Sequence, residues 1–428
     1  MEVRDPIHGA VLLDAPEATL LRDPYLQRLR HVRQVGFSYL PFPGANHSRF
    51  AHVLGVAHLA GLAFDRAYRD WSFDDPAARA RLRATVRLAA MCHDLGHAPF
   101  SHCTEFAMPP VRDLHISWYR SEPGDRRANH EDYAIAILEH TSLGRAIRAN
   151  FVCDPVHVAA LISGDVRVGD EFFRDGGLDH RRLLSQIISS ELDVDRLDYL
   201  VRDAYFTGAR YGMVDVGWIL SHLSAHTAHG QVWLALDRAA LYAFEDFLVS
   251  RYHMFLQVYF HHTSVVYEEM LKRFVGNGGG GWSIPSDLDA YVHQDDVSLE
   301  AHMRACADPW ARRIVEHRPF RRVVERHGQG RQVNTEREIA ALAAAGVEVI
   351  HTESSPRLSR YALGRRSARS VPIFVQERLP GERPGRVSTL TEASSIFDRY
   401  ADVHSISRVY VSPEDRDRAM ALLAALET

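Results

Sequence analysis

Apolar residues at helical spacing constrain the fold of this chain more than any other feature. They recur every three or four positions in a series of segments that Pro, Gly, Asn or Asp residues separate. The segments that we expect to be helical are 16–35, 48–70, 77–96, 129–141, 154–163, 180–190, 195–207 and 238–275. Residues 1–13 alternate loosely and contain DPIHG, which predicts a short hairpin instead. The sequence therefore predicts a helical core over residues 1–275.

The pattern changes beyond this core. The glycine-rich run GNGGGG is typical of a flexible break, and the arginine-rich stretch after it again has helical spacing. Short β-rich runs follow before a final helical segment, namely VEVIH (347–351), VPIFVQ (371–376) and SRVYVS (407–412). We expect a mostly α protein with three regions: the core at 1–275, an arginine-rich helical extension at 276–345 and a small α+β region at 346–428.

The composition argues against a membrane protein and against a broadly basic surface for nucleic acid. The 428 residues carry a formal net charge of −5. No apolar run reaches the roughly 18 residues that a membrane span needs, and the start MEVRDPIHGAVLLDA does not resemble an export signal. The four cysteines have no CxxC spacing, which favours reduced thiols. We therefore expect a cytoplasmic protein that does not bind membranes.

The stretch MCHDLGHAPFSH, residues 91–102, concentrates three histidines and an aspartate. In a helix that ends near Gly96, His93 and His97 lie one turn apart, and Asp94 projects about 100° round from His93. A neighbouring imidazole and carboxylate can converge on one ion. Nitrogen and oxygen ligands suit Mn, Fe, Co, Ni, Zn or Mg better than they suit a thiolate-binding metal. The stretch therefore predicts half of a metal or phosphate site.

Further ligands must come from elsewhere in the chain. The segments NHSRFAHVLGVAHLAG and SSELDVDRLDYLVRD offer His47, His52, His58, Asp193, Asp195, Asp198 and Asp203. At 100° per residue, Asp195, Tyr199 and Asp203 fall on one side of the second segment, opposite its leucines. An acidic and aromatic row of this kind is either a solvated surface or one wall of a site, and the spacing leaves both interpretations open.

Several motifs taken together resemble one enzyme family. They are RQVGFSYLPFPGANHSRFAHVLGVAHLAG, CHDLGHAPFSH, NHED and SSELDVDRLDYLVRDAYFTGARYG. Over about residues 1–275 the chain resembles the deoxynucleoside triphosphate triphosphohydrolase branch of the HD-domain phosphohydrolase superfamily, and beyond them the likeness is loose. The resemblance implies an HD-domain helical core with a smaller C-terminal α+β region. It also implies metal-dependent hydrolysis of deoxynucleoside triphosphates to deoxynucleoside and triphosphate.

The resemblance further implies roles for individual residues. It places one divalent metal ion on His52, His93, Asp94 and Asp195. It places His97, His102, Glu105 and His130 at the reaction centre, with His130 as the proton donor to the leaving oxygen, held by Glu105. It assigns phosphate contacts to Arg49, Arg196 and Arg251, and contacts with the deoxyribose and base to Gln34, Tyr199, Asp203 and Tyr259. Attack on phosphorus needs a metal, cations and a general acid, which these residue types supply.

The same resemblance implies partners and some departures from the family. It implies a homo-oligomer, with a tetramer favoured, additional Mg²⁺ on the nucleotide phosphates, and a nucleotide effector. Gln27 and Arg30 match the family's guanine-nucleotide site, but Arg22 stands where a base-reading aspartate is found, which argues against activation by GTP. Arg196 and His262 stand where the animal enzyme has lysines, and Glu105 replaces an aspartate.

Two other functions stay open from the sequence. The same metal centre would serve an HD-type nuclease or nucleotide phosphodiesterase. Alternatively, the chain is a nucleotide- or nucleic-acid-binding regulatory protein with weak hydrolase activity, whose binding surface is the arginine run after the glycine-rich break. This run comprises Arg304, Arg312, Arg313, Arg318, Arg321, Arg322, Arg326 and Arg331. Because such runs are usually solvated or lie between subunits, nucleic acid is the less favoured partner.

Overall fold

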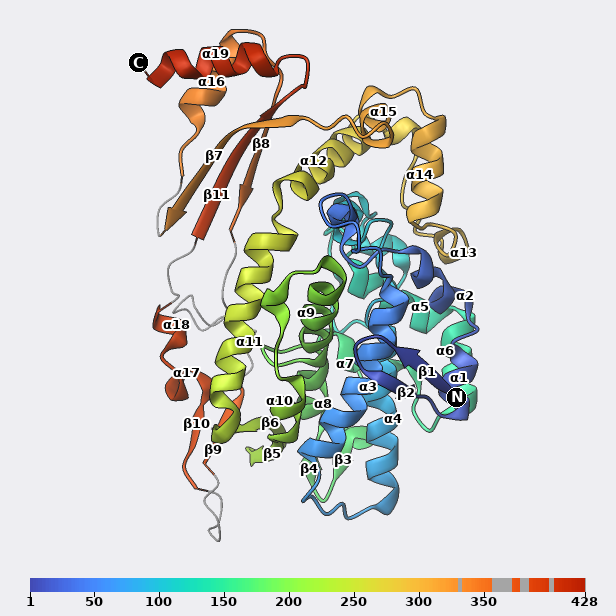
Figure 1. Ribbon diagram of the computed structural model, residues 1–428. Coiled ribbons are helices and arrows are strands. Elements are labelled where there is room, and N and C mark those ends of the chain that lie inside the picture. Colours follow the sequence, from blue (N-terminus) through green and yellow to red (C-terminus); the bar gives the residue numbers. More distant parts are fainter. Residues whose placement is uncertain (330–332, 356–371, 378–384, 400–403, 428) are drawn as a thin grey trace.

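The computed structural model describes residues 1–329, 333–355, 372–377, 385–399 and 404–427. It confirms a mostly α protein with a smaller C-terminal region that contains a sheet. Figure 1 shows a helical body that holds the N-terminal half of the chain and a three-stranded sheet at the opposite end of the molecule. The helix α12 (His262–Gly276) begins beside this sheet and runs away from it across the end of the body.

The first elements form a hairpin and two short helices. They are β1 (Glu2–Asp5), β2 (Gly9–Leu12), α1 (Ala15–Leu20) and α2 (Pro24–Arg28). The hairpin is antiparallel, as predicted. The prediction of one helix at 16–35 is wrong, because Asp23 caps a second helix that restarts with Pro24 in its first turn.

The predicted core helices are present, with small shifts at their ends. They are α3 (Arg49–Ala67), α4 (Pro76–Cys92), α5 (His130–His140), α7 (Pro155–Ile162), α8 (Arg181–Ile188) and α9 (Val194–Thr207). Two further helices, α6 (Ser142–Asn150) and α10 (Val216–Ser221), were not predicted. Helix α3 contacts α4, α8 and α9, and most of its residues are buried. A helix with small or apolar residues on nearly every side has to lie inside the core. It therefore positions the side chains that surround it.

The expected long helix at 238–275 is divided. Helix α11 (Leu241–Met254) passes into a π-helical turn at Phe255–Tyr259, and α12 starts after it. A π-turn widens the helix locally and is frequent at functional sites. It places Tyr259, one of the predicted substrate residues, at the end of the interruption.

A second sheet, which the sequence did not predict, packs beside the core helices. It contains β3 (Arg174–Asp175), β4 (Leu178–Asp179), β5 (Leu223–Ala228), β6 (Gln231–Asp237), β9 (Phe374–Gln376) and β10 (Val387–Thr389). Strands β5 and β6 form a hairpin through His229 and Gly230, whose φ angles are 52° and 73°. Strand β9, expected in the small C-terminal region, pairs in parallel with β6. A late segment of the chain therefore completes a sheet of the core.

The arginine-rich stretch is helical only in its first part. Its helices are α13 (Leu288–Tyr291), α14 (Asp296–Ala305) and α15 (Pro309–Val315), and β7 (Arg321–Gln329) follows them. The prediction of helix up to about residue 345 is thus wrong over β7. A bulge opposite Val409 and Tyr410 shifts the strand register there, which breaks the alternation that would identify a strand. Arg331 lies outside the described residues.

Three antiparallel strands form the C-terminal sheet in the order β7–β11–β8, with β8 at Val349–Ser354 and β11 at His404–Val411. Helices α16 (Glu336–Ala344) and α19 (Arg416–Glu427) pack together beside it, while the short α17 (Leu390–Ala393) and α18 (Ile396–Arg399) lie nearer the core (Figure 1). Tyr410 of β11 belongs to the apolar cluster that includes α12 and donates a hydrogen bond to the His262 carbonyl. The sheet therefore packs against the helix that follows Tyr259, one of the predicted substrate residues.

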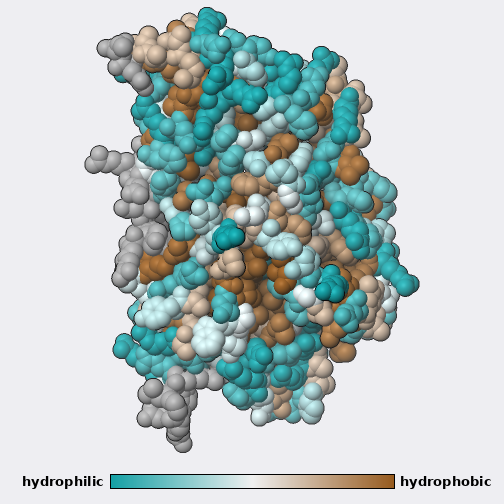
Figure 2. All heavy atoms as spheres, in the orientation of Figure 1, coloured by the Kyte–Doolittle hydropathy of each residue, from teal (hydrophilic) through white to brown (hydrophobic). Residues whose placement is uncertain are grey.

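The surface in the orientation of Figure 2 is hydrophilic at its margins, with apolar residues gathered around the middle of the face. Among the described helices, none is both long and apolar enough to cross a bilayer.

Candidate metal centre and catalytic pocket

The predicted metal residues converge from three elements. His52 lies in α3, His93 and Asp94 end α4, and Asp195 lies in the first turn of α9. Possible ligand atoms of His52, His93 and Asp195 all lie within 4.8 Å of one another, and we call these three residues the metal cluster. The Asp195 Oδ1 atom is 3.0 Å from His52 Nε2 and 3.7 Å from His93 Nε2.

Hydrogen bonds fix how both imidazoles point. The His52 Nδ1–H donates to Asp198 at 2.7 Å, and the His93 Nδ1–H donates to the Ala90 carbonyl at 2.7 Å. Each Nε2 atom then carries a lone pair, and neither has a hydrogen-bond partner among the described residues. Buried lone pairs that face a carboxylate repel it unless a cation lies between them. The metal cluster is therefore shaped for a cation.

The electrostatics agree with this geometry. Burial alone would lower the pKa of His52, but the Asp195 and Asp198 carboxylates outweigh burial and raise this pKa to about 10. Asp94 and Asp195 likewise raise the pKa of His93 against the effect of burial. The hydrogen bonds from His52 and His93 hold the pKa of Asp195 below its usual range, although burial opposes this. The carboxylates therefore favour a positive charge here, which a metal ion supplies when it replaces the protons.

The fourth predicted ligand, Asp94, lies at the edge of the metal cluster. Its Oδ1 atom is 3.3 Å from His93 Nε2 and 3.1 Å from His97 Nε2, and its Oδ2 atom accepts a hydrogen bond from Arg49 at 2.5 Å. Burial opposes ionisation, but Arg49 and the neighbouring histidines hold the Asp94 pKa well below its usual range. Asp94 therefore connects the metal cluster to Arg49, one of the predicted phosphate contacts, and to a second group of histidines.

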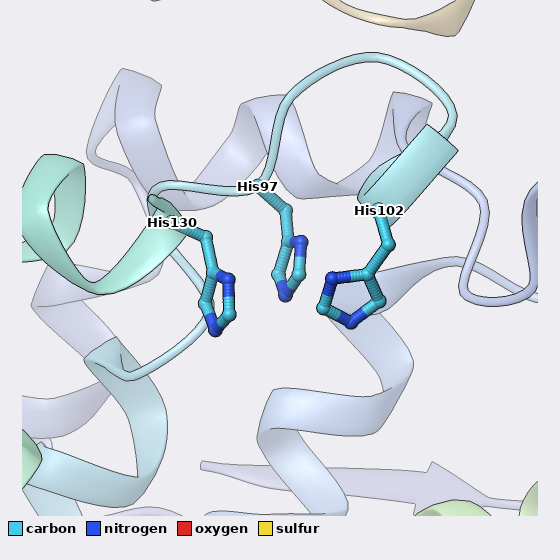
Figure 3. Close-up of side chains that lie close together, drawn as sticks. All are labelled: His97, His102 and His130. Carbon is cyan, nitrogen blue, oxygen red and sulfur yellow. The ribbon is translucent and has the colours of Figure 1, made fainter. Parts of the chain in front are cut away.

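This second group consists of His97, His102 and His130, and we call it the histidine cluster. Figure 3 shows the three rings pointing toward one another from the loop after α4, from the 3₁₀ turn at Ser101–Ala107 and from the start of α5. His97 and His130 stack with ring centroids 4.1 Å apart. Glu105 accepts hydrogen bonds from Nδ1 of both His130, at 2.8 Å, and His102, at 3.1 Å. The structure thus adds His102 to the expected Glu105–His130 contact.

The loop between the two clusters is held in an unusual conformation. Phe100 and Ser101 both have left-handed backbones, with φ angles of 58° and 60°. The Phe100 N–H donates to the buried Asp296 of α14, and the Ser101 hydroxyl accepts from Arg49 Nε at 2.7 Å. A Cβ atom on Gly96 would lie 2.0 Å from the His130 carbonyl oxygen. Gly96 therefore allows the loop to lie directly against α5. The left-handed backbones of Phe100 and Ser101 are a form of strain that is common at functional sites.

A cavity of about 600 Å³ opens beside the metal centre, and the predicted substrate residues Gln34, Arg49, Tyr199, Asp203 and Tyr259 line it, together with His102. Asp203 accepts hydrogen bonds from the Tyr259 hydroxyl and from His47 Nε2, both at 2.7 Å. His47, a candidate metal ligand from spacing, is therefore used to hold Asp203. Of the other candidates, Asp193 caps α9, and neither it nor His58 belongs to the metal cluster.

The other two predicted phosphate contacts, Arg196 and Arg251, do not line this cavity. Both lie against the buried Glu191, whose Oε2 atom is 3.6 Å from Arg196 Nη1 and 3.4 Å from Arg251 Nη2. Both also lie close enough to Tyr199 to oppose the rise that burial causes in its pKa. The two arginines therefore stand behind one wall of the cavity, with an internal carboxylate between them.

The sequence did not identify several residues that line the cavity. One wall is formed by β8 and the residue after it, His351–Ser355, and by Glu268 and Lys272 of α12. Burial raises the pKa of Glu268 to about 7. Only the packing of the C-terminal sheet onto α12 brings these residues to the cavity, so no local motif marks them.

The expected effector residues Arg22, Gln27 and Arg30 line a separate cavity of about 580 Å³ near Met1. Most of the arginine run has carboxylate neighbours in the described part of the chain. Arg313 and Arg318 pair with Glu414, Arg322 with Glu325 and Arg326 with Glu338. This pairing is typical of a folded surface and leaves less free positive charge for nucleic acid.

Comparisons with known proteins identify two family regions. Residues 49–203 match the HD domain, and residues 214–348 match the HD associated region. An uncharacterized protein of Methanocaldococcus jannaschii is 27% identical over 322 residues, which make up 75% of this chain and 59% of the relative. The deoxynucleoside triphosphate triphosphohydrolase SAMHD1 homolog of Dictyostelium discoideum is 33% identical over 206 residues, or 48% of this chain and 36% of the relative.

A solved structure extends the likeness to the whole fold. The crystal structure of a hypothetical protein from Aquifex aeolicus has a TM-score of 0.74 and 26% identity, and the match covers 99% of each chain. The chain spans 59% and 36% of the lengths of the two curated relatives. All four predicted metal residues fall within the matched HD domain. The chain therefore contains an HD domain, and an HD-associated region follows it.

Proposed function

We propose that the protein is a metal-dependent hydrolase that splits deoxynucleoside triphosphates into deoxynucleoside and triphosphate. One observation carries this proposal. The hydrogen-bonded pair Asp203–Tyr259 lines a pocket together with His102, one of two histidines that share Glu105, and Arg49 of the same pocket donates to Asp94 beside the metal cluster. The metal cluster and the histidines that share Glu105 suit phosphoryl chemistry, and the pair Asp203–Tyr259 offers a donor and an acceptor for a sugar hydroxyl.

The residues of the metal cluster fit a divalent cation, since two buried imidazole nitrogens without hydrogen-bond partners face a carboxylate. We propose that His52, His93, Asp94 and Asp195 hold it. When bound, such a cation polarises a phosphoryl oxygen and lowers the pKa of a water ligand. Nitrogen and oxygen ligands allow Mn, Fe, Co, Ni, Zn or Mg, and additional Mg²⁺ would accompany the nucleotide phosphates.

The protein's own residues would complete the reaction. Arg49 lines the cavity and neutralises phosphate charge, with Arg196 and Arg251 behind the wall. Water would form a bond to the α-phosphorus as the bond from that phosphorus to the 5′-oxygen breaks. His130 would donate a proton from Nε2 to the leaving 5′-oxygen, and the proton lost by the attacking water would restore the protonated histidine. Glu105 accepts the Nδ1–H of His130 throughout, which keeps Nε2 directed at the leaving oxygen. His102 shares this carboxylate and is the second histidine able to serve in that step.

A product assay of metal-reconstituted protein tests the proposal. The protein, loaded in turn with Mn²⁺, Co²⁺ or Mg²⁺, is incubated with each dNTP and NTP, alone and in mixtures, and the products are separated by chromatography. Deoxynucleoside with intact triphosphate is the expected result, and stimulation in mixtures would identify an effector. Monophosphate or cut polynucleotide would instead indicate the phosphodiesterase or nuclease function. Tight binding without turnover would indicate a regulatory binding protein.

The remaining partner assignments are proposals of the same kind. We propose a homo-oligomer, with a tetramer favoured, in a cytoplasmic setting. Light scattering of the metal-loaded protein with and without nucleotide measures its mass in solution and checks the tetramer directly.

A further inference from the structure

The carboxylate of Asp198 lies directly behind the metal cluster and is fully enclosed by donors. Its Oδ2 atom accepts hydrogen bonds from His52 Nδ1 at 2.7 Å and from Arg202 Nε at 2.8 Å. Its Oδ1 atom accepts from Arg202 Nη2 at 2.8 Å and from His8 Nε2 at 2.6 Å. Asp198 and Arg202 are both 0% exposed. Each oxygen therefore has two donors, and no water is needed to complete the set.

The N-terminal hairpin supplies one of these donors and holds another. His8 follows the first strand, 190 positions before Asp198 in the sequence. Asp5, at the end of β1, accepts a hydrogen bond from Arg202 Nη1 at 2.8 Å. Its other oxygen accepts from the backbone N–H groups of Ile7 and His8, at 2.8 and 2.9 Å. Asp5 thus fixes both the turn that carries His8 and the arginine that faces Asp198.

Helix α3 packs closely against the side chains of Asp198 and Arg202. A Cβ atom on Gly55 of α3 would lie 2.0 Å from Asp198 Oδ1 and 2.4 Å from Arg202 Nη2. The helices approach so closely that only a glycine fits there. The Asp198 carboxylate keeps its orientation only while its donors remain. If one donor were lost, the buried oxygen left without a hydrogen bond would cost free energy, and rotation of the side chain would become favourable.

We propose that His8 and Asp5 are positioning residues of the metal centre. They hold Asp198, which in turn fixes the His52 tautomer and aims its Nε2 atom at the cation. A carboxylate behind a metal-binding histidine is known to orient the ring and to strengthen it as a ligand. This inference rests on the metal centre proposed above and adds to it two residues from the opposite end of the sequence.

The chain offers a matched control in the same N-terminal region. Arg87 of α4 forms a buried ion pair with Glu17 of α1 and donates to the Leu12 carbonyl of β2. This pair also fastens the N-terminal segment to the core, but it does not contact Asp198. Glu17→Gln should therefore destabilise the protein without altering the metal centre.

The test measures Co²⁺ binding to metal-free full-length protein, by competition with a chelating dye and by the visible spectrum of the bound ion. Variants His8→Ala, His8→Gln and Glu17→Gln are compared at a temperature where each is folded, as checked by thermal unfolding. We expect His8→Ala to weaken Co²⁺ affinity by about 10–100-fold and to change the spectrum. His8→Gln should restore most of the affinity, since its amide can donate to Asp198. Glu17→Gln should lower Tm and leave affinity and spectrum unchanged.

Two results would overturn the inference. One is wild-type Co²⁺ affinity in His8→Ala, and the other is an equal loss of affinity in Glu17→Gln. Failure of the proposed metal centre itself would give a different result. In that case either the wild-type protein would bind no Co²⁺, or His52→Ala would bind it as tightly as the wild type. No nucleotide enters the measurement, so its outcome does not depend on which substrate is hydrolysed.

Discussion

The metal cluster and the histidine cluster are neighbours built from the same residue type, yet their surroundings prepare them for different chemistry. In the metal cluster each imidazole donates through Nδ1 and presents a buried lone pair to a carboxylate. In the histidine cluster His97 and His130 stack, and His102 and His130 share Glu105 beside the open cavity. His52 and His130 both donate through Nδ1 to a carboxylate, so the surroundings of the ring, rather than the Nδ1 partner, distinguish the proposed metal ligand from the proposed proton donor.

Exposure and charge reinforce this difference. His52 is 0% exposed and His93 is 9% exposed, whereas the His102 side chain is 65% exposed. Asp195 and Asp198 raise the pKa of His52, while burial, Arg49 and His130 hold the pKa of His97 well below its usual range. A neutral His97 between Asp94 and His130 can therefore bridge the two clusters without adding a positive charge.

The largest effect should follow from removing the carboxylate of the metal cluster. Asp195→Ala leaves two facing imidazoles without their negative partner, so we expect loss of the bound metal and turnover at background. Elemental analysis and the product assay measure the two properties. His31→Ala, which removes an exposed histidine of the same domain, serves as the control. An Asp195→Ala protein with full metal content and full activity would refute the ligand set.

The histidine cluster should respond in the opposite way, with metal retained and turnover reduced. His130→Ala is expected to lower turnover by about 10²–10⁴-fold if it is the general acid, with unchanged metal content. His102→Ala, measured in parallel, shows which ring transfers the proton, because the larger loss marks the donor. A substrate with a good leaving group should recover much of the activity. Unchanged turnover in His130→Ala would remove this residue from the mechanism.

A smaller effect is expected when Glu105, the carboxylate that His102 and His130 share, is altered. The hydrogen bonds from His102 and His130 outweigh burial and hold the pKa of Glu105 below its usual range. Glu105→Gln keeps the shape but loses a charged acceptor, a change worth about 1.5–3 kcal/mol, or roughly 10–100-fold in turnover. Steady-state kinetics at saturating substrate measure it. A loss confined to KM would contradict a function in the chemical step.

The pair Asp203–Tyr259, which we propose to contact the sugar, should affect binding more than chemistry. Tyr259→Phe removes the hydrogen bond to Asp203, worth about 1 kcal/mol, so we expect KM to rise about fivefold with little change in kcat. Tyr205→Phe, at an exposed position of α9, is the matched control. An equal change in both variants would show that the effect does not come from the cavity.

The smallest expected effect lies outside both clusters, at Glu268. Because burial raises its folded-state pKa from 4.5 to about 7, the folded protein binds more protons than the unfolded chain between these values. The free energy of unfolding should therefore fall as pH rises from about 4.5 to about 7. Glu268→Gln removes this contribution. Denaturant titrations across that range compare the two slopes, and identical slopes would contradict the assignment.

Several features could be predicted from the sequence because they are local. Helical spacing predicted α3, α4, α5 and α9, because the apolar period of a helix is visible within one continuous stretch of sequence. The pairing of His93 with Asp94 indicated a cation for the same reason, because adjacent residues at a helix end project to one side. The resemblance then named the residues that the structure brings together in the metal cluster.

Only the tertiary structure decided the features that depend on distant partners. Strand β7 was mistaken for helix because a bulge hides its alternation, and β9 joins the core sheet through a parallel contact with β6. The hydrogen bond between His8 and Asp198 and the position of β8 at the cavity wall also depend on segments that are distant in the sequence. The sequence determined which residues carry nitrogen and oxygen ligands. Packing between segments 146 positions apart decided which nitrogen of His52 is free, because Asp198 accepts the proton of its other nitrogen.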